Sequence, residues 1–193
     1  KLNAASGGGS FSLQAPSSSS NNRVFTIPDE ADATLLTSNT STGKILQVLQ
    51  NTKTSTASTS STTLQDTGLS QAITLTSASN KILVMYSLYM ACVNGTYSGA
   101  TSIIRGSSEI FIGDANGSAI RATSHFWPTH GRVMALQSHT FLDTPGAGTH
   151  TYKIQYKAGY AGYSVYIGRP QQSATSEYAG AVPSSLTLME VAV

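Results

Sequence analysis

The chain has 193 residues, of which only 10% are charged, and its formal net charge is +2. In ordinary soluble domains roughly a quarter of the residues are charged. Here Ser and Thr, rather than charged residues, make up about a quarter of the chain. So small and scattered a positive charge argues against a nucleic-acid partner. The single cysteine, Cys92, excludes an intrachain disulfide and a cysteine-based zinc site, and its apolar neighbours predict that it is buried.

Residues 1–42 are rich in Gly, Ser, Thr and Asn. They contain short extended signals, in which Phe25 and Ile27 alternate before Pro28 and Leu35 gives a later apolar contact. This is too little apolar surface for an independent core. We expect an extended, β-rich stalk segment whose apolar side chains are buried by neighbouring chains or another protein; a flexible linker is the alternative.

From residue 43 onward, apolar runs alternate with turn sequences such as Asn116-Gly117 and Pro145-Gly146. No window keeps a helical period over the usual 10–12 or so residues, and about eight to ten strands are expected. The Thr- and Ser-rich stretch 52–63 is expected to be either a loop or edge strands. The sequence therefore predicts an all-β protein, with a stalk over 1–42 and an antiparallel, jelly-roll-like β-sandwich head domain over 43–193.

One expected strand, Ile82–Val93, is apolar on both faces. An antiparallel sheet usually turns one face to water, so two apolar faces imply burial on both sides. A partner subunit or a covering loop could bury the second face. The stretch is interrupted by Ser87 and too short to span a bilayer, so no membrane insertion is expected. The candidates for a subunit interface are Phe25, Ile27, Leu35, Leu83, Met85 and Tyr89.

The chain ends in a similarly apolar run, in which Leu186, Leu188 and Glu190 alternate with Thr187, Met189 and Val191. Chain ends fray unless they are tied into a sheet. We therefore expect a final, docked strand.

No pattern in the sequence predicts catalysis. There is no nucleophile elbow, and the glycines of 146–148 are not followed by the lysine and helix of a phosphate-binding loop. The carboxylates are scattered, so no pair is singled out for glycoside hydrolysis. The histidines match no zinc spacing. We expect no enzyme, no catalytic residue, no metal and no cofactor, with a polysaccharide-degrading enzyme as the least favoured alternative. The four histidines are His125, His130, His139 and His150.

Aromatic residues on uncharged, glycine-containing segments are the candidates for recognition. The only tryptophan, Trp127, lies beside Pro128, and several tyrosines between 156 and 166 are interleaved with glycines. Such side chains are good contacts for sugars or proteins. The alternative is that they pack in the core or between subunits. The receptor-binding candidates are Trp127, His130, Tyr160 and Tyr163.

The segment 22–37, which contains NRVFTIPD and ATLLT, resembles a unit common in tailed-bacteriophage fibres and related virion proteins. In that unit a strand and turn of the form R-x-[IVF]-T-[IL]-P-D lead into G-T-L and a distal domain. This chain has Ala33 where the glycine is usual, which changes the expected local turn. Blocks at 43–50, 67–70, 81–84 and 185–190 also resemble the distal domains of such proteins.

The resemblance implies a homotrimer with an intertwined stalk and a β-sandwich head. It also implies a tail fibre or spike tip that mediates host-cell attachment. The expected location is the virion, assembled in the host cytoplasm, and the expected partners are other virion proteins of the tail or capsid and a host surface receptor or glycan. A capsid head fibre or decoration protein is the alternative.

Overall fold

The computed structural model describes residues 2–3, 10–11, 44–93, 97–172, 175–177 and 179–193. The chain divides into two compact units, Lys1–Thr40 and Ser41–Val193. In the first unit, β1 (Leu2–Asn3) pairs antiparallel with β2 (Ser10–Phe11).

The predicted boundary between residues 42 and 43 lies outside the described residues. So do the stalk candidates Phe25, Ile27 and Leu35.

The second unit is built from strands, and the described residues contain no helix, hence none that could cross a membrane. Every strand pairing is antiparallel, which confirms the all-β, antiparallel prediction. The strands are β3 (Ile45–Lys53), β4 (Ala57–Thr59), β5 (Gln65–Thr74), β6 (Lys81–Cys92), β7 (Gly99–Arg105), β8 (Ser108–Ile110), β9 (Ser124–Phe126), β10 (Ala135–Asp143), β11 (Thr149–Ala158), β12 (Val165–Ile167) and β13 (Ser184–Val191).

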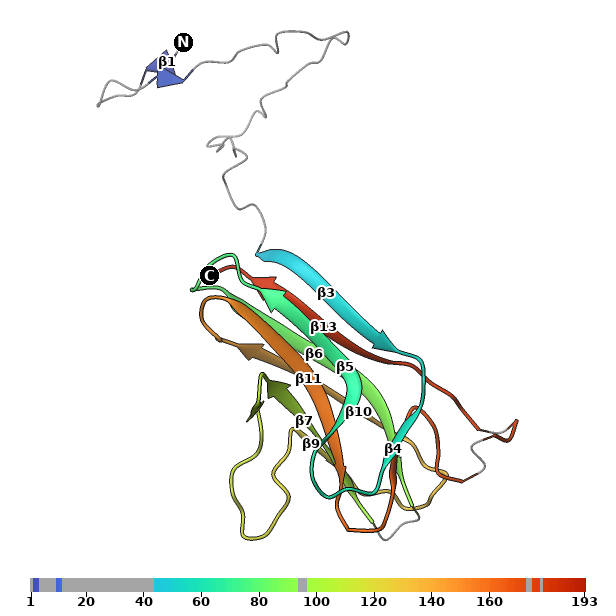
Figure 1. Ribbon diagram of the computed structural model, residues 1–193. Helices are drawn as coiled ribbons and strands as arrows, with labels where there is room; N and C mark the ends of the chain where they lie inside the picture. The colour runs from blue at the N-terminus through green and yellow to red at the C-terminus, as the bar shows by residue number, and fades with distance from the viewer. Residues whose placement is uncertain (1, 4–9, 12–43, 94–96, 173–174, 178) are drawn as a thin grey trace, which may run out of the picture. The chain divides into compact units, whose positions relative to one another are not determined.

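The strands form two sheets. Sheet I has the order β3-β13-β6-β12-β4, with β10 on the other edge of β6, and sheet II has the order β5-β11-β7-β8, with β9 also on β7. The pairing is nested: β3 pairs with β13, β5 with β11, β6 with β10, and β7 with β9. Figure 1 shows the long strands lying roughly along one common axis, with their arrows pointing in alternating directions. The stretch 52–63 contributes the end of β3 and the edge strand β4.

One hydrophobic core joins the two sheets. Strand β6 closely matches the predicted apolar run, and its even-numbered side chains from Ile82 to Cys92 are buried in this core. From sheet II, Ile103, Tyr152 and Ile154 face them and are fully buried. The hydroxyls of Tyr86 and Thr101 share a hydrogen bond of 3.0 Å between the sheets. Cys92 is buried and free, as predicted.

Strand β13 lies between β3 and β6, which confirms the prediction of a docked final strand. Its inward face carries Leu186 and Leu188, both fully buried, and also Glu190, which is equally buried. The Glu190 carboxylate accepts hydrogen bonds from Gln47 Nε2 at 2.6 Å, Asn80 Nδ2 at 2.6 Å, and the backbone N–H and hydroxyl of Thr76 at 2.7 Å each. Burial alone would raise its pKa, but the hydrogen bonds outweigh burial and lower the pKa to about 2.

A second buried polar group joins the two sheets through Asp143 on β10. Its Oδ2 accepts hydrogen bonds from Arg105 Nη1 and from the Tyr152 hydroxyl, each at 2.6 Å. Burial, and then the hydrogen bond to Asp143, raise the pKa of Tyr152 well above its usual value. Tyr152 therefore remains a neutral hydrogen-bond donor.

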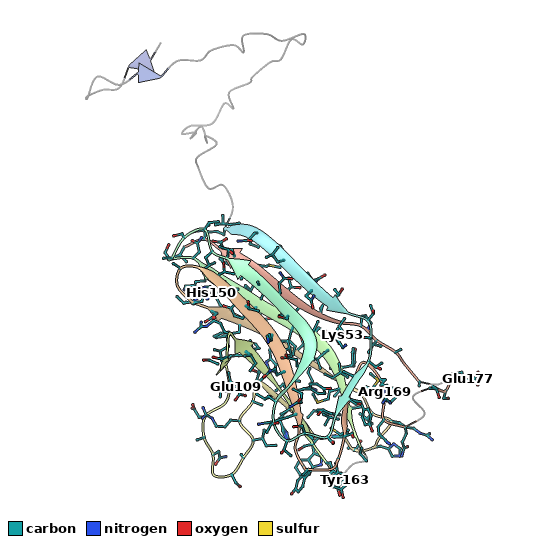
Figure 2. All side chains as sticks on the ribbon, viewed as in Figure 1. Lys53, Glu109, His150, Tyr163, Arg169 and Glu177 are labelled. Atoms are coloured by element: carbon teal, nitrogen blue, oxygen red, sulfur yellow. The ribbon has the colours of Figure 1, made fainter. Side chains whose placement is uncertain are left out.

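The register places the connections of the second unit at two ends. At the end called here the base, the start of β6 pairs with the end of β13, and Val191 pairs with Ile45 at the start of β3. At the opposite end, called the loop end, β6 finishes at Cys92, and Gly99 pairs with both Phe126 and Ala158. Figure 1 shows the C-terminus beside the start of β3, and Figure 2 shows Tyr163 at the far end of the unit.

Candidate functional site

A pocket of about 390 Å³ lies at the loop end. Its wall comes from the residue before β7, the β8–β9 connection, β9 with the residue after it, and the residues that follow β11. The lining residues are Ser98, Ser118, Ala119, Ile120, His125, Trp127, Gly159 and Tyr160.

Strand pairing brings these segments together. Because Gly99 pairs with both Phe126 and Ala158, the neighbouring residues Ser98 and Gly159 lie close to each other, and the chain leaves β9 beside them. The backbone N–H of Gly159 donates to the Ser98 carbonyl oxygen at 2.8 Å. A Cβ on Gly159 would lie 2.1 Å from Ser98 Oγ and 3.1 Å from the Ser98 carbonyl oxygen. A larger residue would collide with Ser98, so glycine permits this close approach in the pocket wall.

The local pattern of β9 turns aromatic side chains outward. Phe126 is buried in the core, so its neighbours His125 and Trp127 project to the other side of the strand. Trp127 is 61% exposed and Tyr160 is 59% exposed. The His125 ring lies edge-on to the Trp127 ring, with centroids 6.4 Å apart. Two large aromatic surfaces thus border the pocket and remain open to solvent.

A cluster of three tyrosines continues from the pocket. The ring of Tyr97 stacks on Tyr163, with centroids 3.4 Å apart, and meets Tyr160 edge-on at 5.7 Å. The backbone N–H of Tyr163 closes a turn onto the Tyr160 carbonyl oxygen at 3.4 Å. This packing holds Tyr160 against a tyrosine from another loop, so its ring is supported although it is exposed.

The pocket is uncharged at neutral pH. Apart from His125, none of its lining residues is acidic or basic. Burial lowers the pKa of His125 below its usual value, so its imidazole is neutral at pH 7. The polar groups that remain are hydroxyls, amides and this neutral ring. The site can therefore stack an apolar surface and exchange hydrogen bonds, but it offers no fixed charge.

The structure brings together two of the four receptor-binding candidates, Trp127 and Tyr160. Tyr163 belongs to the adjoining tyrosine cluster. His130 does not line the pocket; it is exposed in the loop before β10, where its Nδ1 accepts the Arg132 N–H at 3.2 Å. The exposure of Trp127 also excludes, within one chain, the alternative that it belongs to the core.

Several pocket residues were missed by the sequence analysis. Ser98, Ser118 and Ile120 carry no local signal that separates them from other loop residues. Gly159 belongs to the tripeptide Ala-Gly-Tyr, which occurs twice between residues 158 and 163. A glycine before a candidate tyrosine was a usable local signal for a residue of the site.

The four histidines do not come together. His125 borders the pocket. The ring centroids of His139 and Tyr86 are 6.0 Å apart. His150 Nε2 shares a hydrogen bond of 3.0 Å with the Gly146 carbonyl oxygen. Among the described residues, no group of three or more His, Cys, Asp or Glu side chains could hold a metal ion.

A second candidate surface is the outer face of sheet I, which carries Leu83, Met85 and Tyr89. Opposed residues of paired strands share a face, so this face consists of successive rows across β3, β13, β6 and β10. Nearest the base, Val191 lies opposite Lys81; of the three rows that follow, the first is wholly apolar and the other two carry no charged side chain. The rows are Val48, Met189, Leu83 and Leu142; then Gln50, Thr187, Met85 and Thr140; then Thr52, Ser185, Ser87 and Ser138.

Within the described part of the chain this face remains open. Val48 is 54% exposed and Leu142 is 45% exposed, while Met85 and Tyr89 are each more than one-third exposed. Only toward the loop end is a residue of this face buried: Ala91 pairs with Tyr166, whose ring is covered by the Arg169 guanidinium at 4.4 Å. The outer face thus offers a flat, apolar and hydroxyl-rich surface.

The sequence matches no protein-family model, and a search of curated proteins finds no significant match. The geometry of the two surfaces and the sequence motifs are therefore the features that indicate a function. The pocket is suited to hold a small ligand by stacking and hydrogen bonding, and the outer face of sheet I is suited to pack against another apolar surface.

Proposed function

We propose that this chain is the head of a trimeric attachment protein, a tail fibre or spike tip of a tailed-phage virion, and that its loop end contacts the host-cell surface. The observation that carries the proposal is the pocket bordered by exposed Trp127 and Tyr160, at the end of the unit opposite the base. The chain enters the sheets at the base, at the start of β3. Within the second unit, the pocket therefore lies at the end opposite the start of β3.

The strand order supports the viral assignment. In a jelly roll the first long strand pairs with the last, the second with the second-last, and so on inward. The strands of this unit pair in the same order. Jelly rolls occur in viral capsid and lectin domains. With the phage-fibre motifs of 22–37, the order favours an attachment head over an unrelated two-sheet protein.

The outer face of sheet I supports the trimer. Three of its rows contain no charged side chain, so copies of the chain that pack through these rows meet no charge repulsion there. Burial of an apolar row across four strands would stabilise the assembly. Presentation of three pockets on one particle would also raise the avidity for a repeated surface ligand.

The trimer is tested by mass measurement of the full chain under native conditions. We expect a species of three times the chain mass of 20.1 kDa. Met85→Lys places a charge in the proposed interface and is expected to shift the protein to monomer. Ala72→Lys, at an exposed position of β5 in sheet II, is the matched control and should leave the trimer intact. A stable wild-type monomer contradicts the trimer.

Host attachment is tested by the adsorption of labelled full chain to host cells. Trp127→Ala is expected to weaken adsorption by at least about tenfold, because aromatic anchors at the centre of a contact contribute about 2 kcal/mol or more. The fold should be retained, since the side chain is largely exposed. Val193→Ala removes an exposed apolar side chain near the base and is expected to change nothing. Equal adsorption of wild type and Trp127→Ala would overturn the proposal.

A further inference from the structure

We propose that the loop-end pocket binds an uncharged pyranose unit of a surface glycan, stacked against Trp127 and Tyr160. The inference deepens the proposed function, on which it rests for the biological source of the sugar. The binding chemistry itself is argued from the pocket alone.

The size of the pocket selects a small ligand. Its volume of about 390 Å³ lies near the lower limit of small-molecule pockets, which span roughly 300–1,000 Å³. A pocket of this size holds one or two sugar rings and leaves the rest of a glycan chain in solvent. Trp127 and Tyr160 are largely exposed, so a ligand in the pocket can reach both rings.

The chemistry of the lining matches a pyranose. One face of a pyranose ring presents C–H groups, whereas its rim carries hydroxyls. Exposed aromatic rings provide a flat apolar surface with a polar edge, which is complementary to such a face. The hydroxyls of Ser98, Ser118 and Tyr160 can donate and accept hydrogen bonds with the rim.

The absence of charge in the lining selects a neutral sugar. Sites for carboxylates or phosphates typically use Arg or Lys, and the pocket lining contains neither. Arg121 follows Ile120 in the chain but does not line the pocket, and its Nε donates to the Gly113 carbonyl oxygen at 2.8 Å. A uronic acid would therefore lose the hydration of its carboxylate without gaining a cationic partner.

Trp127 is the only tryptophan of the chain, so its emission reports directly on the pocket. The full chain is titrated with the methyl glycosides of glucose, galactose, mannose and N-acetylglucosamine, and separately with methyl glucuronide and methyl galacturonide. We expect a saturable change in emission with at least one neutral glycoside, with Kd on the order of 1 mM. The acidic glycosides should bind at least about tenfold more weakly.

Variants locate the binding within the pocket. Tyr160→Ala removes one stacking surface and leaves the Trp127 reporter in place; it is expected to raise Kd by about tenfold. Val133→Ala, at an exposed apolar position outside the pocket lining, is the control and should leave Kd unchanged. No saturable change with any neutral glycoside, tighter binding of the acidic glycosides, or an unchanged Kd in Tyr160→Ala would each overturn the inference.

The outcomes separate this inference from the proposed function. If Trp127→Ala abolishes adsorption to cells but no neutral glycoside binds, the attachment role stands and the ligand is of another class, such as a peptide. If neutral glycosides bind with the expected variant pattern but the chain does not adsorb to cells, the sugar site stands and the attachment role is wrong.

Discussion

Replacement of Glu190 by glutamine is expected to lower the free energy of unfolding by about 3 kcal/mol. The fully buried carboxylate accepts four hydrogen bonds, three on Oε1 and one on Oε2. Glutamine has only one acceptor oxygen, and its amide nitrogen is a donor. In one orientation this nitrogen would face Gln47 Nε2, and in the other it would face the donors of Thr76 and Asn80. Chemical denaturation of the purified variant measures the loss.

The matched control is Glu109→Gln, at an exposed position on β8, which should leave stability unchanged. The pH dependence provides a second check. Because the pKa of Glu190 in the folded state is about 2 and its usual value is 4.5, its contribution is fully present above about pH 4.5 and is lost as the pH falls toward 2. Glu190→Gln should lose this part of the acid sensitivity. Equal stability and equal acid sensitivity in wild type and variant would contradict the role assigned to Glu190.

Replacement of Asp143 by alanine is expected to lower the free energy of unfolding by about 3 kcal/mol. The change leaves the Arg105 guanidinium and the Tyr152 hydroxyl without their shared acceptor between the sheets. The value is at the low end for a broken buried ion pair, because the Arg105 side chain keeps 33% exposure and regains part of its hydration. Thermal and denaturant unfolding of the full chain measure the change.

The other ion pair of the described residues provides the comparison. Lys153 Nζ and Asp66 Oδ2 are 3.6 Å apart, and the Asp66 side chain is 57% exposed. Solvent screens such a pair, so Asp66→Ala is expected to cost less than about 1 kcal/mol. If Asp66→Ala were as destabilising as Asp143→Ala, burial would not be the origin of the effect.

The strands were largely predictable because alternation of apolar side chains is a local property of the sequence. In β6, the long apolar run identifies the strand, but because both faces are apolar it does not say which face points into the core; the structure buries the side of Ile82 and Cys92. The turn at Asn116-Gly117 is likewise local, and the structure has the Ala119 N–H donating to the Asn116 carbonyl oxygen there. The docking of β13 followed from its apolar pattern.

The network around Glu190 could not be predicted in the same way. The alternation placed Glu190 on the face of Leu186 and Leu188, which was a signal for burial. Its partners Gln47, Thr76 and Asn80 come from three other parts of the chain. Only the register of β13 against β3, and the turn before β6, bring them together.

The pocket depends on long-range register even more strongly. Trp127 and Tyr160 were selected as aromatic residues near glycine or proline, which is a local criterion. Their meeting requires that Gly99 pair with both Phe126 and Ala158. The outer face of sheet I presents the converse case: the sequence predicted its apolar character, whereas what covers it is a property of more than one chain.

The most direct test of the attachment model is hydrogen–deuterium exchange of the full chain with and without glycan extracted from the host-cell surface. Slower exchange is predicted for the backbone around Ser98, Ile120, Trp127 and Tyr160, at the loop end. Exchange at the base, around Ile45 and Val191, should be unchanged. Protection at the base or on the outer face of sheet I alone, with none at the loop end, would contradict the model.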